Sequence, residues 1–203
     1  MTLDIGSAYL NANIAKDVFM VLDSEIVEVL RQVHPEVDKL RQDDGSIIVK
    51  LKKALYGCVE SAKLWYSNIS NKLISIGFKP NAKDPCILNK VYMGKQLTVC
   101  LYVDDFLCTC VDETGLKWLQ EELLKEYKEV NANFGRIHSY IGMLFDWSID
   151  GRVSVSMSGY ITDILSSFGV VGSRATPGKQ IYFTLMELAA DFQMTQETHS
   201  GHA

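Results

Sequence analysis

The stretch LTVCLYVDDFLCTCV, residues 97–111, places two adjacent aspartates between two apolar runs. Leu97–Val103 leads into Asp104–Asp105 and Phe106–Val111 leads away, which predicts a β-hairpin that turns at the acidic pair. Glycine is the usual residue in a two-residue turn because such turns often need a positive φ, so an Asp–Asp turn is mildly strained. The pair is therefore either a solvated polar turn or a pair of ligands for a metal ion.

Helix and strand patterns alternate along the rest of the chain. Apolar residues spaced by three and four predict helices over residues 24–40 with an interruption at Pro35, 58–76, 116–130 and 160–168, the last capped by Ser158 and stopped by Gly169. Alternating apolar residues and turn signals predict strands at residues 3–5, 47–51, within 85–111 and within 140–158, where Asp150–Gly151 marks a turn. Because tight hairpins pair neighbouring strands, the expected fold class is α+β, with a mostly antiparallel sheet and helices packed on one face.

Composition narrows the class of protein. The chain has 203 residues, 47% of them hydrophobic and 22% charged, which suits one good-sized core or a domain with an extension. We find neither an apolar run long enough to cross a bilayer nor a signal peptide, so no membrane partner is expected. Five cysteines without a CxxC pair favour reduced thiols in an intracellular compartment over a disulfide framework or a zinc site.

The charge is unevenly distributed along the sequence. Residues 50–95 carry nine lysines and two acids, a local net charge of +7 in a chain whose total is −5. A basic segment can contact phosphates, but a lysine-rich solvated face has the same composition, and charge alone favours the solvated face.

A third acid stands at the end of another predicted strand. Asp4 is followed by Ile5, the small residues Gly6–Ser7–Ala8, and then Tyr9. Small residues let the backbone approach a ligand and offer amides for an anion-binding nest, with Tyr9 as a wall; the alternative is an ordinary strand-end acid with Tyr9 in the core.

If Asp4 lies beside Asp104 and Asp105, the carboxylates require compensation. Two such charges about 4 Å apart repel by about 4 kcal/mol at an effective dielectric constant of 20. A divalent cation removes the conflict, and a pair of magnesium ions on such acids is suited to nucleotidyl transfer.

Several blocks of the sequence resemble, in order, copia-type retrotransposon reverse transcriptases. The blocks are DIGSAYLNANIAKDVFM (4–20), KLKKALYGCVESAKLWY (50–66), GFKPNAKDPCIL (77–88), LYVDDFL (101–107), YIGM (140–143) and VSMSGYITDILSSFG (155–169). The resemblance covers about residues 3–178. It implies an RNA-directed DNA polymerase built on a reverse-transcriptase palm.

The resemblance assigns catalytic roles to residues at both acidic blocks. It implies that Asp4, Asp104 and Asp105 are catalytic and hold two Mg²⁺ ions, or Mn²⁺ in their place, with Ile5 in the metal-binding set and the second acid of the pair often less essential. Tyr9 would be a steric gate against a ribose 2′-hydroxyl. Gly6, Ser7 and Ala8 would lie beside the triphosphate of the incoming dNTP.

Further residues are candidates for contact with the RNA or DNA template-primer. The resemblance places Tyr56–Gly57 at the templating base, whereas Trp65 on the following apolar stripe is better explained as a core anchor. Lys50, Lys52 and Lys53 would hold backbone phosphates or lie on a solvated surface. Tyr140, Ile141, Gly142 and Met143 resemble a primer grip, and an ordinary sheet hairpin explains them equally well.

The sequence also departs from the family pattern. We expect the fingers region to be missing, residues 1–178 to form the palm and the start of the thumb or connection, and residues 179–203 to form a divergent, disordered tail. Cys58–Val59–Glu60 is an unusual run after Tyr56–Gly57. The chain is thus expected to be a truncated or decayed copy, partnered by polyprotein segments such as integrase and RNase H.

Cellular location and rival functions also follow from the resemblance. A cytoplasmic location, in virus-like particles, or a nuclear one is expected. The rivals are an RNA-templated RNA polymerase, which the bulky Tyr9 disfavours, a non-catalytic nucleic-acid-binding transposon remnant, and a plain structural domain.

Overall fold

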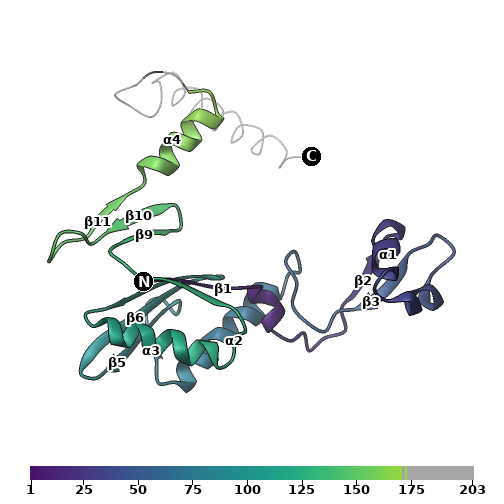
Figure 1. The fold of residues 1–203 in the computed structure, drawn as a ribbon, viewed down its shortest axis with the longest axis horizontal. Coiled ribbons are helices and arrows are strands. Elements are labelled where there is room, and N and C mark those ends of the chain that lie inside the picture. The colour runs from purple at the N-terminus through teal and green to yellow at the C-terminus, as the bar shows by residue number, and fades with distance from the viewer. Residues whose placement is uncertain (171, 173–203) are drawn as a thin grey trace, which may run out of the picture. The chain divides into compact units, whose positions relative to one another are not determined.

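The computed structural model describes residues 1–170 and 172 (Figure 1). The chain divides into two compact units, Met1–Met157 and a second that starts at Ser158. The predicted disordered tail, residues 179–203, lies outside the described residues. No helix in the described ranges is long and apolar enough to span a bilayer.

The main sheet of the first unit has six strands within the described residues, in the order β4-β5-β6-β7-β1-β8. Every neighbouring pair in it is antiparallel, which confirms the expected sheet type. The strands are β1 (Thr2–Ile5), β4 (Lys79–Pro80), β5 (Ile87–Tyr92), β6 (Lys95–Tyr102), β7 (Asp105–Cys110) and β8 (Val130–Asn133).

Two helices, α2 (Ser61–Ser75) and α3 (Glu113–Leu124), cover one face of this sheet (Figure 1). Their apolar stripes meet the alternate residues Leu97, Val99 and Leu101 of β6 in one buried cluster. Trp65 of α2 is 1% exposed in that cluster, so its interpretation as a core anchor is confirmed. The alternation of β6 leaves Thr98, Cys100 and Tyr102 on the opposite face, which the helices do not cover.

A small module is inserted between residues 13 and 53. Strands β2 (Phe19–Leu22) and β3 (Ile47–Lys50) pair antiparallel, and between them lie α1 (Ser24–Arg31) and the 3₁₀ helix η2 (Pro35–Leu40). Val27, Val37 and Ile47 form a second buried cluster. The predicted helix over 24–40 is therefore two helices, separated at Pro35 as the sequence indicated.

A three-stranded antiparallel sheet follows the main one. It consists of β9 (Ile137–Tyr140), β10 (Met143–Asp146) and β11 (Ser154–Ser156). The Asp150–Gly151 turn lies in the connection from β10 to β11, as predicted, and Gly151 has φ +73°. In the second unit, α4 spans Ser158–Ser167 and is followed by Gly169, whose φ is +61°, and the Val170 N–H donates to the Leu165 carbonyl.

Three sequence-based boundaries were wrong. The central hairpin turns at Val103–Asp104, one residue earlier than predicted, because Tyr102 pairs with Asp105. The helix expected to reach residue 130 ends at Leu124, and Val130 begins β8, which pairs with β1. The helix expected from residue 58 starts at Ser61.

Candidate active site

Strand pairing brings two of the predicted catalytic acids together. Asp4 of β1 is the direct partner of Asp105 of β7, and directly opposed residues in an antiparallel pair lie about 4.5–5.5 Å apart between Cα atoms. The neighbouring pair, Leu3 and Phe106, is buried against the helices. Because side chains alternate between faces, the two acids lie on the helix-free face of the sheet.

The third acid, Asp104, lies in the adjacent turn, which hydrogen bonds from Tyr56 and Trp65 hold in place. Asp104 accepts a hydrogen bond of 2.8 Å on Oδ2 from the Tyr56 hydroxyl. The Trp65 indole N–H donates to the carbonyl of Val103, whose φ is +55°, a strained value for a β-branched residue. These contacts fix the turn that presents Asp104.

The environment of Asp105 disfavours its charged form. Burial, followed by the charges of Asp104 and Asp4, raises the pKa of the Asp105 carboxyl above its ordinary value. Burial, the hydrogen bond to Asp104 and nearby negative charges raise the pKa of Tyr56 to about 12. Among the described residues, no Lys, Arg or His forms an ion pair with any of the three acids. The cluster therefore carries uncompensated negative charge.

The donor chemistry of the three acids suits a hard divalent cation. Magnesium prefers carboxylate oxygens, and none of these three acids forms an ion pair with a Lys, Arg or His among the described residues. Within the ranges that the structure describes, no group of three or more His, Cys, Asp or Glu side chains is already arranged as a metal site. The acids thus fit the ion by chemical type and by register, and metal binding stays a prediction.

Asp105→Asn should raise the thermal stability of the metal-free protein at neutral pH. The pKa of Asp105 is higher in the folded protein than in the unfolded chain, so the ionised carboxylate destabilises the fold. This destabilisation is absent below the unfolded pKa and develops as the pH rises through the folded pKa. The amide removes it, so we expect an unfolding midpoint about 1–2 °C higher than wild type at about pH 7 and equal below about pH 3.5. Thermal denaturation across this pH range is the measurement. Added Mg²⁺ should stabilise the wild type more than the variant, and a less stable metal-free variant at neutral pH would contradict the repulsion.

Hydrogen bonds from the Asn11 side chain and to the Glu129 backbone hold the loop after Asp4. Ser7 has φ +53° and precedes the 3₁₀ helix η1 (Ala8–Asn11), and the Asn11 amide donates to the carbonyls of Gly6, Ser7 and Ala8 at 3.2–3.4 Å. The Gly6 N–H donates to the Glu129 carbonyl at 3.1 Å, which takes this amide out of the predicted anion nest. A Cβ at Gly6 would lie 2.3 Å from Oε2 of Glu129, so this side chain occupies the space beside the glycine.

Tyr9 and Tyr56 meet beside the acids. Tyr9 comes from η1 and Tyr56 from the turn before α2, and their ring centroids are 4.2 Å apart with an interplanar angle of 37°. The structure therefore joins two predicted substrate-binding residues that are 47 positions apart in the sequence. Gly57, with φ +93°, follows in the same turn.

Comparison with known proteins assigns the chain to a family. A family model described as reverse transcriptase (RNA-dependent DNA polymerase) matches residues 1–179. The chain belongs to this reverse transcriptase family. The copia-type resemblance found in the sequence is thereby confirmed.

Curated relatives of this reverse transcriptase chain are transposon polyproteins. It is 27% identical over 85% of its length to the retrovirus-related Pol polyprotein from transposon RE1 of Arabidopsis thaliana. It is 26% identical over 93% of its length to the transposon Ty1-BR Gag-Pol polyprotein, and 31% identical over 66% to the truncated transposon Ty1-A Gag-Pol polyprotein, both of Saccharomyces cerevisiae. The chain spans 10–11% of these relatives' lengths. No solved structure matches.

The predicted primer grip of this reverse transcriptase lies at the turn between β9 and β10. Ile141 and Gly142 both have positive φ, 51° and 72°, as a two-residue hairpin turn requires. Tyr140 is buried, its hydroxyl donates to the Cys100 carbonyl at 3.3 Å, and its pKa is raised by burial first, with Asp105 among the nearby groups that contribute. Tyr140 thus contacts the helix-free face through Cys100 of β6.

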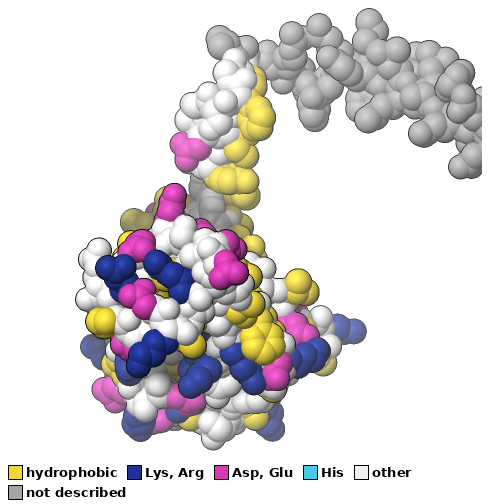
Figure 2. Space-filling model, turned by 90° about the vertical axis from the view of Figure 1, so that its right-hand side faces the viewer, with side chains coloured by type: hydrophobic (Ala, Val, Ile, Leu, Met, Phe, Trp, Pro, Cys, Tyr) yellow, Lys and Arg dark blue, Asp and Glu magenta, His cyan; other side chains and the backbone are white. Residues whose placement is uncertain are grey.

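The predicted phosphate-binding lysines lie at the base of the inserted module. Lys50 forms an ion pair with Asp17 at 2.5 Å, and Lys52 and Lys53 are exposed. Figure 2 shows blue basic and magenta acidic side chains interspersed over one face of the protein. Lys50 therefore has a protein partner, whereas Lys52 and Lys53 stay candidates for phosphate contact.

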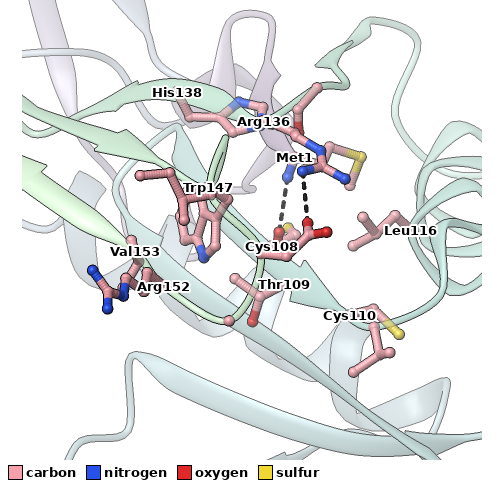
Figure 3. A pocket seen from close by; sticks show the side chains of 15 residues that line it. Met1, Cys108, Thr109, Cys110, Leu116, Arg136, His138, Trp147, Arg152 and Val153 are labelled. Atoms are coloured by element: carbon pink, nitrogen blue, oxygen red, sulfur yellow. Dashed lines mark hydrogen bonds and ion pairs between the residues drawn. The ribbon is translucent and has the colours of Figure 1, made fainter.

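A cavity of about 520 Å³ lies beside β7, apart from the acids (Figure 3). Cys108, Thr109 and Cys110 line it together with Trp147 and Arg152. None of the predicted site residues contributes to its lining. The candidate active site is therefore an open sheet face, and this cavity is not part of it.

Sequence reasoning missed two polar residues at the site, Glu129 and Asn131. Asn131 of β8 is the second direct partner of Asp4, and its amide lies 3.5 Å from Oδ2 of Asp4 and 3.5 Å from Oε1 of Glu129. The signal that could have found Asn131 is the polar alternation of VNAN, residues 130–133, which the assignment of Val130 to a helix concealed; Glu129 directly precedes this strand.

Proposed function

We propose that this chain supplies the catalytic centre of an RNA-directed DNA polymerase, which adds deoxynucleotides to the 3′-hydroxyl of a primer paired with an RNA template. The observation that carries the proposal is the direct pairing of Asp4 with Asp105, with Asp104 in the adjoining turn. Two distant parts of the sequence thus meet at one end of the sheet: Asp4 and Asp105 lie on the face that the helices leave open, and Asp104 lies in the adjoining turn.

Asp4, Asp104 and Asp105 would hold two Mg²⁺ ions, or Mn²⁺, with the backbone carbonyl of Ile5 as a further oxygen donor. When bound, such ions lower the pKa of the primer hydroxyl and neutralise charge that develops on the transferred phosphate. The fixed strand register orients two of the carboxylates without any loop rearrangement, and the turn orients the third. Preorganised acceptors of this kind lower the cost of assembling the charged transition state.

Aromatic and small residues would select and seat the dNTP. Tyr9 would exclude a ribose 2′-hydroxyl, Gly6–Ser7–Ala8 would border the triphosphate, and Tyr56–Gly57 would contact the templating base pair. Tyr140–Met143 would hold the primer end, which the proximity of Tyr140 to Asp105 supports. Lys52 and Lys53 would contact template phosphates.

Primer extension by the full 203-residue chain tests the proposal. We expect incorporation of dTMP on poly(rA)/oligo(dT) that requires Mg²⁺, stops on addition of EDTA, and exceeds incorporation of UMP. A preference for UTP would favour an RNA-templated RNA polymerase.

The second candidate function is nucleic-acid binding without catalysis. The absence of a ready-formed metal cluster among the described residues is the observation that favours it. Absence of incorporation, together with RNA binding that weakens steeply with salt, would overturn the polymerase proposal in favour of this candidate.

A further inference from the structure

We infer that Tyr56 is a positioning residue for the Tyr9 ring, and that through Tyr9 it sets the discrimination between deoxyribonucleotides and ribonucleotides. The inference rests on the proposed role of Tyr9 as the sugar gate. It assigns Tyr56 a duty beyond contact with the templating base.

The first step is the contact between the two rings. The Tyr9 and Tyr56 centroids are 4.2 Å apart, slightly closer than the range of about 4.5–7 Å that is usual for interacting aromatic pairs. Tyr9 is half-buried, whereas Tyr56 is 54% exposed. Tyr56 therefore covers one side of Tyr9 from solvent and limits the space into which the Tyr9 ring can turn.

The second step is the anchoring of Tyr56 itself. An exposed tyrosine would ordinarily change rotamer freely, but the Tyr56 hydroxyl donates to Oδ2 of Asp104 at 2.8 Å. A hydrogen bond to a carboxylate is stronger than one between neutral groups. The bond fixes the outer end of the ring whose face contacts Tyr9.

The third step is the rigidity of the anchor. Asp104 follows Val103, whose carbonyl accepts a hydrogen bond from the buried Trp65 indole. Contacts therefore run from the helical core through Trp65, the turn and Tyr56 to Tyr9. A steric gate discriminates only if its ring does not yield to the additional hydroxyl, and these contacts supply that resistance.

The geometry also links the gate to a catalytic acid. Asp104 uses one carboxylate oxygen for Tyr56, which leaves its other oxygen for a cation. The same side chain thus faces the gate and the predicted metal-binding cluster. A change at Tyr56 should alter sugar selectivity more than the rate with the correct substrate.

The test compares Tyr56→Phe with Tyr66→Phe. Tyr56→Phe keeps the ring and removes the anchoring bond, while Tyr66→Phe removes a matched hydroxyl that donates to the Pro85 carbonyl at 2.9 Å, away from Tyr9. The measured quantity is the ratio of kcat/KM for dTTP to that for UTP on poly(rA)/oligo(dT). We expect Tyr56→Phe to lower this ratio about tenfold, mainly through a gain with UTP, since a hydrogen bond to a charged group has about this effect. Tyr66→Phe should leave it unchanged.

Tyr9→Ala separates failure of the inference from failure of the gate. If Tyr9→Ala lowers the ratio and Tyr56→Phe does not, the positioning role of Tyr56 is overturned while the gate stands. If Tyr9→Ala leaves the ratio unchanged, the gate itself fails and the inference fails with it.

A chemical probe gives an answer that does not depend on activity. Nitration of Tyr9 by tetranitromethane, followed by peptide mass spectrometry, reports how accessible its ring is. We expect nitration of Tyr9 to be about threefold faster in Tyr56→Phe than in Tyr66→Phe or the wild type, because a loosened ring uncovers its neighbour. Equal rates in all three proteins would overturn the positioning role, even for a chain that incorporates no nucleotide.

Discussion

Asp104→Asn should lower dTMP incorporation at least about a thousandfold, equivalent to about 4 kcal/mol of transition-state stabilisation. The amide removes one of the three negative charges at the end of the sheet and replaces an anionic oxygen by a neutral one. Its remaining carbonyl oxygen still accepts the hydrogen bond from Tyr56, so the neighbouring rings should keep their places. Steady-state primer extension at saturating Mg²⁺ is the measurement.

Two further substitutions define the specificity of that loss. Asp105→Asn should reduce incorporation less, about 10- to 100-fold, consistent with the lesser role that the family resemblance implies for the second acid. Asp112→Asn is the matched control, because Asp112 lies beyond the opposite end of β7 from Asp104 and caps α3, where asparagine serves equally well. Incorporation by Asp104→Asn above a tenth of the wild-type rate would contradict the assignment of Asp104 as a catalytic residue.

Trp65→Ala should be the most destabilising of the substitutions considered. The side chain is 1% exposed, contacts Tyr127 edge-on with ring centroids 5.6 Å apart, and lines an apolar cavity of about 250 Å³. Truncation enlarges that cavity and leaves the Val103 carbonyl without its indole donor. We expect a loss of about 3–5 kcal/mol in the free energy of unfolding, or about 10 °C in the midpoint.

Trp118→Ala is the control for the loss of an indole ring. Trp118 is half-buried on α3, stacks on Tyr92 at 4.9 Å between ring centroids, and lies under the Lys90 ammonium at 4.7 Å. It does not contact the catalytic turn, so its removal should cost only about 1–2 kcal/mol. Urea denaturation of both variants compares them. A cost below that of Trp118→Ala would show that Trp65 is not the anchor of the turn.

The antiparallel hairpin and its acids could be predicted because the signal is local. Alternating Leu97, Val99 and Leu101 fix which face of β6 is buried, and the polar pair interrupts the apolar run. The position of the turn could not be predicted, since local rules place a β-branched residue such as Val103 outside positive φ. The Trp65 indole on its carbonyl and the pairing of Tyr102 with Asp105 override that preference.

Two strands were missed because partners that are distant in the sequence stabilise them. The three-and-four spacing of apolar residues from Leu116 continues to Val130, yet Val130 is buried in β8 because β1 offers a strand edge there. Strand β2 has only four residues and depends on pairing with β3. Neither sequence pattern contains the information about its partner strand.

The candidate site also combines features that the sequence predicts with contacts that it does not predict. The three acids and Tyr9 follow from the residue types and from the family resemblance. The hydrogen bond from Tyr56 to Asp104 joins residues 48 positions apart, and the contact of Asn131 with Asp4 spans 127. Such contacts depend on tertiary packing, which spacing along the chain does not encode.

The strand register that pairs Asp4 with Asp105 also decides which side chains of β1 are buried. A single-residue insertion within β1 would exchange its two faces, turning Asp4 toward the helices and Leu3 toward solvent. One such slip would bury a carboxylate in the apolar core and remove it from its catalytic partners at the same time. Selection against misfolding and selection for activity therefore act on the same alignment of two short strands, because a two-residue change of length would keep the faces but move Asp4 out of register with Asp105.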